Sequence, residues 1–256
     1  MSISRKNPRE LELMRYAGGI VADCIELVRR HIVPGVTTRE LDALAEDFIR
    51  KERCHAPCLG YHGYPACSCL SVNDQVVHGI PGSRVLREGD IIGVDITVSW
   101  RGYCADMART FPVGMIKPNA QRLIQITEEC FDEAMRVLLV DNTIGDVSAA
   151  VEKHAKSNGY SPVRALCGHG IGSEMHEEPE VPNFGRAHEG PVLQPGMTLA
   201  VEPMINEGKH GVTVADDGWT VSTADHRLSA HHENTIVITP EGPVVLTRPR
   251  EENHGL

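Results

Sequence analysis

Apolar residues follow two different spacings along the chain, and these predict helices and strands in a repeated order. Four segments carry apolar residues three and four positions apart, the spacing of a helix with one buried face: 9–31, 38–52, 119–140 and 145–157. A threonine, Thr37 or Thr38, stands where the second of these helices needs an N-cap. Shorter apolar runs predict strands at about 91–99, 104–113, 198–205, 212–214 and 233–239.

The order of helices followed by strands occurs twice. The segment VLREGDIIGVD at 85–95 is similar to VLQPGMTLAVE at 192–202, which comes 107 residues later and also ends in a carboxylate after an apolar run. Upstream, TRELDALAEDF at 38–48 aligns with GDVSAAVEKH at 145–154. A repeat this long exceeds a solenoid unit, so it predicts one α+β domain built from two related halves. We expect a single domain over 1–256, with pseudo-repeats at about 10–113 and 119–240.

Composition and charge narrow the class of protein. A chain of 256 residues has ample length for a buried core, and its net charge of −10 argues against nucleic-acid binding driven by phosphate contacts. No apolar run reaches the ~18 residues that span a membrane. The N-terminal segment MSISRKNPRELELMR lacks the apolar centre of a secretion signal. We therefore expect a cytoplasmic protein that binds neither nucleic acid nor a membrane.

The eight cysteines fit such a reducing compartment as free thiols. Four of them lie close together in the sequence: Cys54, Cys58, Cys67 and Cys69. Their spacing differs from the paired C-x-x-C ligands of zinc sites, which makes a zinc site the weaker interpretation. Small apolar residues of a core or a pocket are the stronger one.

The stretch GHGIGSEMHEEP holds two histidines, His169 and His176, among three glycines. Glycines at this density disfavour a helix, and an odd separation places the two side chains on opposite faces of a regular strand. We interpret the stretch as a glycine-rich loop or a strand edge where another group approaches the backbone closely. Two ordinary turn histidines remain the alternative at this point.

The segment IIGVDITVSWRGYCADMARTFPVG predicts a β-hairpin. Its two-residue turn would be Arg101-Gly102. This register places Asp106 opposite Thr97, and Asp95 lies two residues from Thr97 on the same face. Asp95 and Asp106 then become diagonal neighbours, roughly 7–8 Å apart at the backbone, where two carboxylates can share one ion.

Two further acids belong to apolar strands: Glu202 in MTLAVEPMI and Glu233 at the start of ENTIVIT. A lone buried carboxylate is costly, so Asp95 in IIGVDIT faces the surface, pairs with a cation or binds a metal. Four bare acids would repel one another strongly, and two divalent cations would cancel their charge. Carboxylates with one histidine suit manganese, iron, cobalt or magnesium better than a structural zinc site. Paired ions of this kind activate water for attack on a carbonyl, and a second histidine could stabilise the developing oxyanion.

Six motifs together resemble the type I methionine aminopeptidases, a peptidase family with the pita-bread fold: NDQVVHGIP, GVDITV, GYCADMART, GHGIGSEMHEEP, PGMTLAVEP and DGWTVST. The ligand order of that family is similar to the order here of Asp95, Asp106, His169, Glu202 and Glu233. The resemblance runs nearly from end to end. It implies a single catalytic domain with an α+β pita-bread fold, in which two pseudo-symmetric halves share a central antiparallel sheet covered by helices.

The resemblance also implies a role for each ligand. Asp106 and Glu233 would bridge two divalent cations. Asp95 would bind one of these cations, and His169 with Glu202 would complete the other. The cations would be cobalt, manganese or iron, with zinc and nickel as further options.

Three catalytic residues are implied as well. Glu202 would be the proton shuttle for the attacking water, and His176 would hydrogen-bond the scissile carbonyl. His78, in VVHGIP, would contact the substrate near the scissile amide. The two histidines of the glycine-rich stretch would therefore differ in task, since His169 would bind metal and His176 would bind substrate.

A side-chain pocket is implied by the stretch PCLGYHGYPACSC, which resembles the methionine pocket of that family. With His78 and His176, the substrate-binding residues would be Cys58, Tyr61, Tyr64, Cys69, Met175 and Trp219. Soft sulfur atoms and aromatic faces suit a thioether.

The chain departs from the family pattern at three places. Met175 and Leu166 stand where the family usually has an aromatic residue, and HHEN at 231–234 replaces a Gln-aromatic-Glu-His segment. Met175 is expected to reshape the pocket, and the HHEN segment puts extra imidazoles beside a metal ligand. None of these changes removes a ligand.

The activity that the resemblance implies is removal of the initiator methionine from nascent proteins whose second residue is small, by water attack on the first peptide bond. The partners would be nascent polypeptide N-termini at the ribosome, and the enzyme would be a monomer. One alternative is another pita-bread metallopeptidase of the X-Pro type, whose extra N-terminal domain would not fit in 256 residues. Another is a non-catalytic binding module of the same fold, which would be expected to lack the metal ligands.

Overall fold

The computed structural model describes residues 3–252 of the chain. Its α-helices are α1 (Pro8–Arg30), α2 (Thr38–Lys51), α3 (Pro118–Val137) and α4 (Ile144–Ser157), and its short 3-10 helices are η1 (Tyr61–Gly63) and η2 (Arg250–Glu252). The strands of the N-terminal half are β1 (Cys69–Val72), β2 (Gln75–Val77), β3 (Ile91–Trp100) and β4 (Tyr103–Pro112). Those of the C-terminal half are β5 (Ser161–Pro162), β6 (Cys167–Gly170), β7 (Glu177–Pro182), β8 (Thr198–Val201), β9 (Met204–Asn206), β10 (Val212–Val214), β11 (Val221–Thr223), β12 (Ser229–His231), β13 (Glu233–Thr239) and β14 (Gly242–Val245).

The four α-helices confirm the four segments that apolar spacing predicts, to within a few residues at each end. Within the part of the chain that the structure describes, none of them combines the length and apolar character that crossing a bilayer requires. The helix starts follow from capping. Asn7, Thr37 and Thr143 each accept a hydrogen bond from the backbone of the first turn and form a capping box with an acidic side chain. Thr37, and not Thr38, is therefore the cap of α2.

One strand prediction is wrong. The apolar run at 198–205 predicts a single strand, but the structure divides it into β8 and β9. Pro203 lies at the break, and proline has no N–H group to donate to a neighbouring strand. The chain therefore leaves the large sheet directly after Glu202 and continues in a small sheet of order β12-β9-β5. The break puts Glu202 directly after the last residue of β8, where its side chain lines a cavity.

The two halves repeat the same local contacts. The caps of α2 and α4 each pair with a valine much further along the chain: Thr37 with Val85, and Thr143 with Val192. Each of these valines begins one of the two similar segments found in the sequence. The contacts are those expected of two related halves, while the bounds proposed for the pseudo-repeats stay a prediction.

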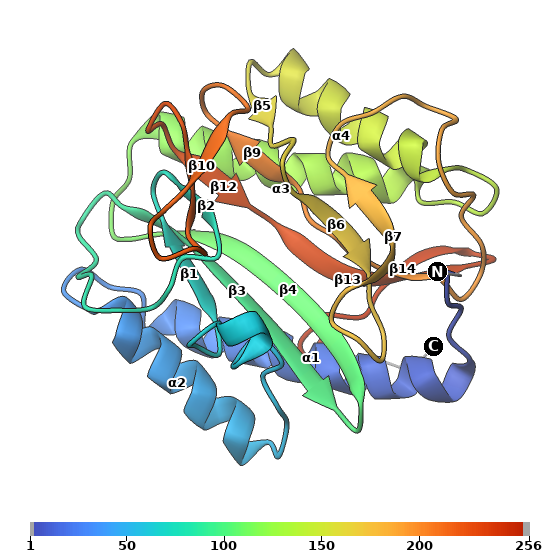
Figure 1. Ribbon diagram of the computed structural model, residues 1–256, viewed down its shortest axis with the longest axis horizontal. Helices are drawn as coiled ribbons and strands as arrows, with labels where there is room; N and C mark the ends of the chain where they lie inside the picture. Colours follow the sequence, from blue (N-terminus) through green and yellow to red (C-terminus); the bar gives the residue numbers. More distant parts are fainter. Residues whose placement is uncertain (1–2, 253–256) are drawn as a thin grey trace.

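The large sheet joins the two halves. Its strand order is β1-β3-β4-β13-β8-β6-β7, with β14 beside β13. In Figure 1, α1 and α2 run along the strands of the N-terminal half, and α3 and α4 run along those of the C-terminal half. The β4–β13 pair is the seam, where Glu233 of one half faces Ala108 of the other.

Side chains alternate between the two faces of this sheet, as they must in strands. One face is apolar and packs on the helices: Val94, Ile96 and Met107 contact α1 and α2, and Leu199 and Ile236 contact α3 and α4. The residues between these, including Asp95 and Asp106, point to the other face. Burial of the apolar face fixes which way the acids point. A shift of one residue in the strand register would move the apolar side chains to the polar face and the acids to the apolar one.

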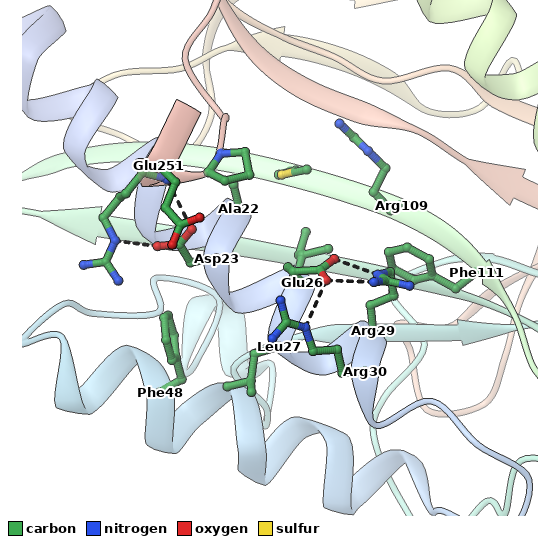
Figure 2. Close-up of a pocket in the computed structure, with 14 residues that line it drawn as sticks. Ala22, Asp23, Glu26, Leu27, Arg29, Arg30, Phe48, Arg109, Phe111 and Glu251 are labelled. Carbon is green, nitrogen blue, oxygen red and sulfur yellow. Dashed lines mark hydrogen bonds and ion pairs between the residues drawn. The ribbon is translucent and has the colours of Figure 1, made fainter. Parts of the chain in front are cut away.

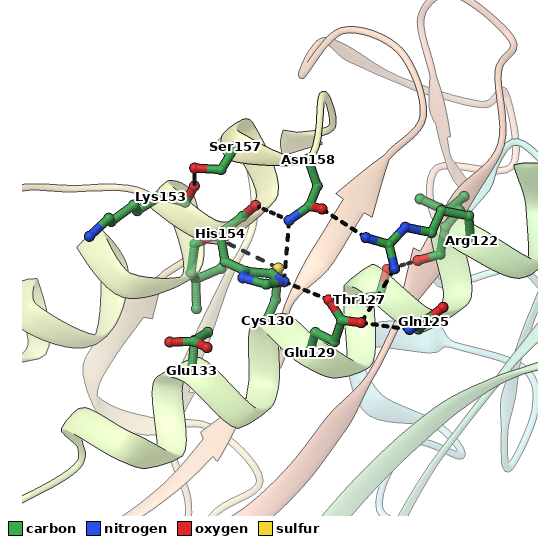
Figure 3. Close-up of polar contacts among 12 residues, drawn as sticks. Arg122, Gln125, Thr127, Glu129, Cys130, Glu133, Lys153, His154, Ser157 and Asn158 are labelled. Carbon is green, nitrogen blue, oxygen red and sulfur yellow. Dashed lines mark hydrogen bonds and ion pairs between the residues drawn. The ribbon is translucent and has the colours of Figure 1, made fainter.

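A polar cluster also connects α3 and α4 at their exposed edge (Figure 3). His154 Nε2 lies 2.9 Å from Glu129 Oε2, and Arg122 donates to the Asn158 side-chain oxygen at 2.8 Å. The hydrogen bond from His154 lowers the pKa of the Glu129 carboxyl. Partly exposed ion pairs of this kind contribute at most about 1 kcal/mol. The apolar contacts beneath the helices, and not this cluster, hold the helix pair to the sheet.

Gly18 provides a test of the packing of α1. A Cβ atom at this position would lie 2.2 Å from the backbone oxygen of Leu246, in the segment that follows β14. Replacing Gly18 with Ala should destabilise the protein by about 1–3 kcal/mol, although alanine is the better helix former, because backbone must move to admit the methyl group. Urea unfolding followed by circular dichroism measures the effect. Gly82→Ala is the control, since its nearest neighbour is 4.0 Å away, and equal stability of both variants would contradict the packing argument.

Candidate active site

The strand registers align acids across the seam of the sheet. Ala108 of β4 pairs with Asp95 of β3 on one side and with Glu233 of β13 on the other. Asn234 pairs with Val201, so Glu202 follows in the same row beside Glu233. Three acids from both halves of the chain are thus brought onto one line of the sheet.

The β3–β4 hairpin has the register that the sequence predicts. Thr97 pairs with Asp106 around the Arg101-Gly102 turn, and Asp95 lies diagonally across from Asp106. The Thr97 hydroxyl donates to Asp106 Oδ2 at 2.9 Å. This hydrogen bond fixes one carboxylate oxygen, while Asp106 Oδ1 is buried without a hydrogen-bond partner.

His169 joins the acids from β6, the strand next to β8. It pairs with Ala200, which points to the same face as Glu202. The Nδ1 atom of His169 lies 2.9 Å from the backbone oxygen of Gly170, so Nδ1 carries the proton and donates. The lone pair is then on Nε2, which is 3.5 Å from Glu202 Oε1. Such outer hydrogen bonds orient imidazoles for metal binding.

The stretch that contains His169 is divided between a strand and the predicted loop: His169 lies in β6, an inner strand of the sheet and not an edge. β6 turns into β7, the last strand of the large sheet, and the loop between them carries His176. A Cβ on Gly170 would lie 2.1 Å from the backbone oxygen of Glu178. Only glycine permits this close approach of the two strands.

Burial of so many acids has a strong electrostatic consequence. Loss of hydration raises the pKa of Asp95, Glu202 and Glu233 well above the usual range, and the charges of neighbouring acids raise it further. Burial also raises the pKa of Asp106. Glu233 Oε1, like the free oxygen of Asp106, is buried without a partner. Unpartnered buried oxygen atoms are costly unless a cation or another donor satisfies them.

The donor set fits divalent cations. Two groups of side chains have ligand atoms that all lie within 4.8 Å of one another: Asp95, His231 and Glu233, and Asp106, His169 and Glu233. The two groups share Glu233. Carboxylate oxygens with imidazole nitrogens, and without thiolates, suit manganese, iron, cobalt and zinc.

A cavity of about 420 Å³ opens onto this cluster. All seven residues predicted as metal ligands or catalytic groups line it: His78, Asp95, Asp106, His169, His176, Glu202 and Glu233. His176 Nδ1 lies 3.0 Å from the Tyr61 hydroxyl, and burial lowers the His176 pKa to about 4, so the ring is neutral near pH 7. His78 has a φ angle of 58°, a strained conformation for a side chain other than glycine and one that is common at functional sites.

A second, smaller cavity of about 120 Å³ adjoins the first. It is lined by the six residues that the sequence predicts for a side-chain pocket: Cys58, Tyr61, Tyr64, Cys69, Met175 and Trp219. The Tyr64 and Trp219 rings meet edge to face with centroids 5.1 Å apart. Of the four clustered cysteines, Cys58 and Cys69 belong to this pocket, whereas Cys54 and Cys67 pack in the core beneath α1 and α2. All eight cysteines are free thiols, as predicted.

Two residues at the site were not predicted from the sequence. Thr97 fixes Asp106, and the hairpin register alone could have identified it, because it pairs with that acid. His231 lies close to Asp95 and Glu233. The HHEN segment signalled extra imidazoles, but the sequence did not say which of them faces the acids.

The departures from the family pattern fall at different places. Met175 forms part of the wall of the small pocket, where its sulfur is 3.7 Å from Cys58 Sγ and 3.4 Å from the Thr97 hydroxyl. Leu166 lines the larger cavity. His232 packs against Phe131 of α3, on the helix-covered face of the sheet.

A cavity larger than the acid-lined one lies elsewhere. About 720 Å³ in volume, it is found between α1, β4 and the C-terminal segment (Figure 2). Two of its acids are already paired with arginines. Glu26 contacts Arg29 and Arg30, and Asp23 contacts Arg250. Arg109 reaches from its wall to the backbone oxygen of Glu233 and supports β13 from behind. Because these acids are already paired, the acid-lined cavity, and not this one, is the candidate active site.

Comparison with known proteins agrees with this geometry. The pattern that defines metallopeptidase family M24 matches residues 12–240. A methionine aminopeptidase of Clostridium perfringens is 50% identical over 242 residues, which cover 94% of this chain and 97% of that protein. Methionine aminopeptidase 1 of Bacillus subtilis is 44% identical over 243 residues, which cover 95% and 98%. The chain belongs to metallopeptidase family M24 and, within it, to the methionine aminopeptidases, as its motifs predict.

Solved structures confirm the fold. The methionine aminopeptidase of Thermotoga maritima superposes with a TM-score of 0.95 at 40% identity, over 96% of this chain and 100% of that chain. A prolidase of Pyrococcus horikoshii superposes with a TM-score of 0.76 at 20% identity, over 97% of this chain and 64% of that chain. The second similarity shows the fold alone. The predicted α+β pita-bread architecture is thereby confirmed.

The raised acid pKa values lead to a stability prediction for the metal-free protein. An acid whose folded pKa is raised stabilises the fold below its ordinary pKa, about 4, and this contribution is lost as pH rises through the folded value. Metal-free Glu202→Gln should therefore become increasingly more stable than the metal-free wild type as pH rises from 4 to 8, and the gap should close near pH 4.

Urea unfolding of EDTA-treated protein between pH 4 and 8 measures this gap. Glu46→Gln, which changes an exposed acid on α2, is the matched control and should show no such pH dependence. A Glu202→Gln variant less stable than wild type at pH 8 would show that the acid is stabilised by something other than a cation.

Proposed function

We propose that this protein is a metalloaminopeptidase that removes the N-terminal methionine from polypeptide chains by hydrolysing the first peptide bond. One observation carries the proposal. The small pocket and the acid-lined cavity share His78, Asp95, Asp106 and His176 as common walls. A side chain seated in the pocket therefore places its own amine and carbonyl beside the acids. The pocket is lined by sulfur and aromatic faces, which suit the thioether of methionine. The activity named for the close relatives is the same.

We infer that two divalent cations complete the site, held by Asp95, Asp106, His169, Glu202 and Glu233. Two ligand groups that share Glu233 support this number, and the charges of two such cations balance four carboxylates. Cobalt, manganese or iron suits these donors, with zinc and nickel as further options. When bound, such ions lower the pKa of water and polarise a carbonyl.

The protein's own residues supply the remaining chemistry. Glu202 directly follows β8 and lines the acid-lined cavity, so its carboxylate can take a proton from the attacking water and pass it to the departing amine. With Tyr61 hydrogen-bonded at Nδ1, the neutral His176 ring can donate from Nε2 to the carbonyl oxygen where charge develops. His78 lies where both cavities meet and can contact the scissile amide.

The resemblance also implies a setting for this reaction. The proposed substrates are nascent chains whose second residue is small. The enzyme would be a monomer that acts at the ribosome, in the cytoplasm. An X-Pro peptidase is not favoured, because the likeness to such enzymes shows the fold alone. A binding module without catalysis would need no cation, whereas the buried, unpartnered acid oxygens require one.

A peptide assay tests the proposal. Protein supplied with manganese or cobalt should release methionine from Met-Ala-Ser and much less from Met-Lys-Ser. Asp106→Asn should lower kcat/KM for Met-Ala-Ser by at least ~100-fold, because loss of a group that merely supports a ligand already costs 10–100-fold. Circular dichroism checks that the variant is folded. Failure of wild-type protein to release methionine with any of the metals would reject the proposal.

The pocket can be tested apart from the metal site. Cys58→Phe should fill the cavity of about 120 Å³ and lower kcat/KM for Met-Ala-Ser by about 100-fold, while the number of cations bound stays the same. Cys54→Ala is the control, because this cysteine lies in the core and outside the pocket. Should Cys58→Phe retain full activity, methionine does not bind in this cavity.

A further inference from the structure

His231 ends β12, and its backbone is held from two sides. In the small sheet it pairs with Met204 of β9. From the large sheet, the Thr110 side-chain oxygen accepts from the His231 N–H and donates to the His231 backbone oxygen, both at 2.9 Å. The direction of the imidazole is thus set by the same strand, β4, that carries Asp106.

The imidazole of His231 faces the acids but bonds to none of them. Its Nε2 atom is 3.7 Å from Glu202 Oε2 and 3.9 Å from Glu233 Oε2. These distances exceed a hydrogen bond. The side chain is only 4% exposed, and Nε2 is buried without a hydrogen-bond partner. A nitrogen atom in this position lacks the partner that buried polar atoms almost always have.

The separations fit ligands of one ion. Ligand atoms bound at about 2.1 Å to the same cation lie up to ~4 Å apart. The Nε2–oxygen distances of His231 fall in that range, and His231 forms a candidate group with Asp95 and Glu233. The neighbouring His232 does not compete for this place, since its ring packs on Phe131 with centroids 5.1 Å apart.

We propose that the His231 imidazole is an additional nitrogen ligand of the metal centre, on the side of Asp95 and Glu233. The inference rests on the proposed function, which provides the cations. The metal centre would then have one imidazole at each cation position: His169 at one and His231 at the other. The five ligands implied by the family resemblance include a single imidazole, so the second one distinguishes this chain.

A second imidazole changes which metals the site prefers. Imidazole nitrogen suits cobalt, nickel and zinc, whereas manganese prefers carboxylate and water oxygens. The side of the centre that holds Asp95 would otherwise contain oxygen ligands alone. His231 should therefore strengthen the binding of cobalt at this position much more than the binding of manganese.

The first experiment uses the wild-type protein and needs no variant. Metal-free protein is loaded with two equivalents of cobalt(II) chloride, and X-ray absorption at the cobalt edge counts imidazole groups by their outer-shell scattering. Two imidazoles per pair of cobalt ions support the proposal. A count of one overturns it, even though the proposed function would stand.

The second experiment compares His231→Gln with His232→Gln, the same substitution one residue further along. Calorimetric titration with cobalt(II) chloride should show one of the two binding events weakened by about 10–100-fold in His231→Gln. Titration with manganese(II) chloride should change by less than about threefold. His232→Gln should bind both metals as the wild type does, and circular dichroism checks that both variants are folded.

The outcomes separate this inference from the proposed function. If wild-type protein binds neither metal, the proposed function fails and the inference falls with it. If wild type binds two cations and His231→Gln binds cobalt with unchanged affinity, only the inference fails. Equal weakening of cobalt and manganese in His231→Gln would also overturn it, because a lost nitrogen ligand should discriminate between the two metals.

Discussion

The burial of four carboxylates on one face of the large sheet is the constraint on which the rest of this structure depends. Asp106, Glu202 and Glu233 are buried and Asp95 lies half-buried beside them, and loss of hydration raises the pKa of every one of these acids. Such a cluster is unfavourable by itself, since like charges repel and oxygen atoms lack partners. The apolar contacts of the opposite face with four helices must hold it in place. The energy stored in this arrangement is available to bind cations tightly.

The duplicated architecture explains how the acids meet. Each half contributes a helix pair and a strand that ends its apolar run with an acid, Asp95 in the first and Glu202 in the second. The seam between β4 and β13 joins the halves, and Ala108 leaves room there for the acids on either side. The part of the site at this seam is rigid, because Asp95, Asp106 and Glu233 are held by strand pairing and not by loops.

The pocket and the acid cluster work as a unit because they share walls. In the proposed function, sulfur and aromatic groups would recognise the substrate directly beside the charged groups, so a bound side chain would set the position of the bond that is cut. Met175 and Thr97 line the small pocket 3.4 Å apart, and Thr97 also hydrogen-bonds Asp106 of the acid cluster. Changes there should affect recognition and chemistry together, whereas the paired charges of the cavity in Figure 2 are remote from both.

The resemblance of six motifs to a known family supplied the candidate ligands and pocket residues. From spacing alone, the sequence determined the four helices and the β3–β4 hairpin. These depend on spacing within short segments and on the register of a two-residue turn, and both are local properties. Only the tertiary structure decided where the run at 198–205 breaks, how β13 pairs with β4, and that His231 and not His232 faces the acids. Adjacent histidines look alike in a sequence. They differ once Thr110 and Phe131, each a hundred or so positions away, fix the backbone of one and pack on the ring of the other.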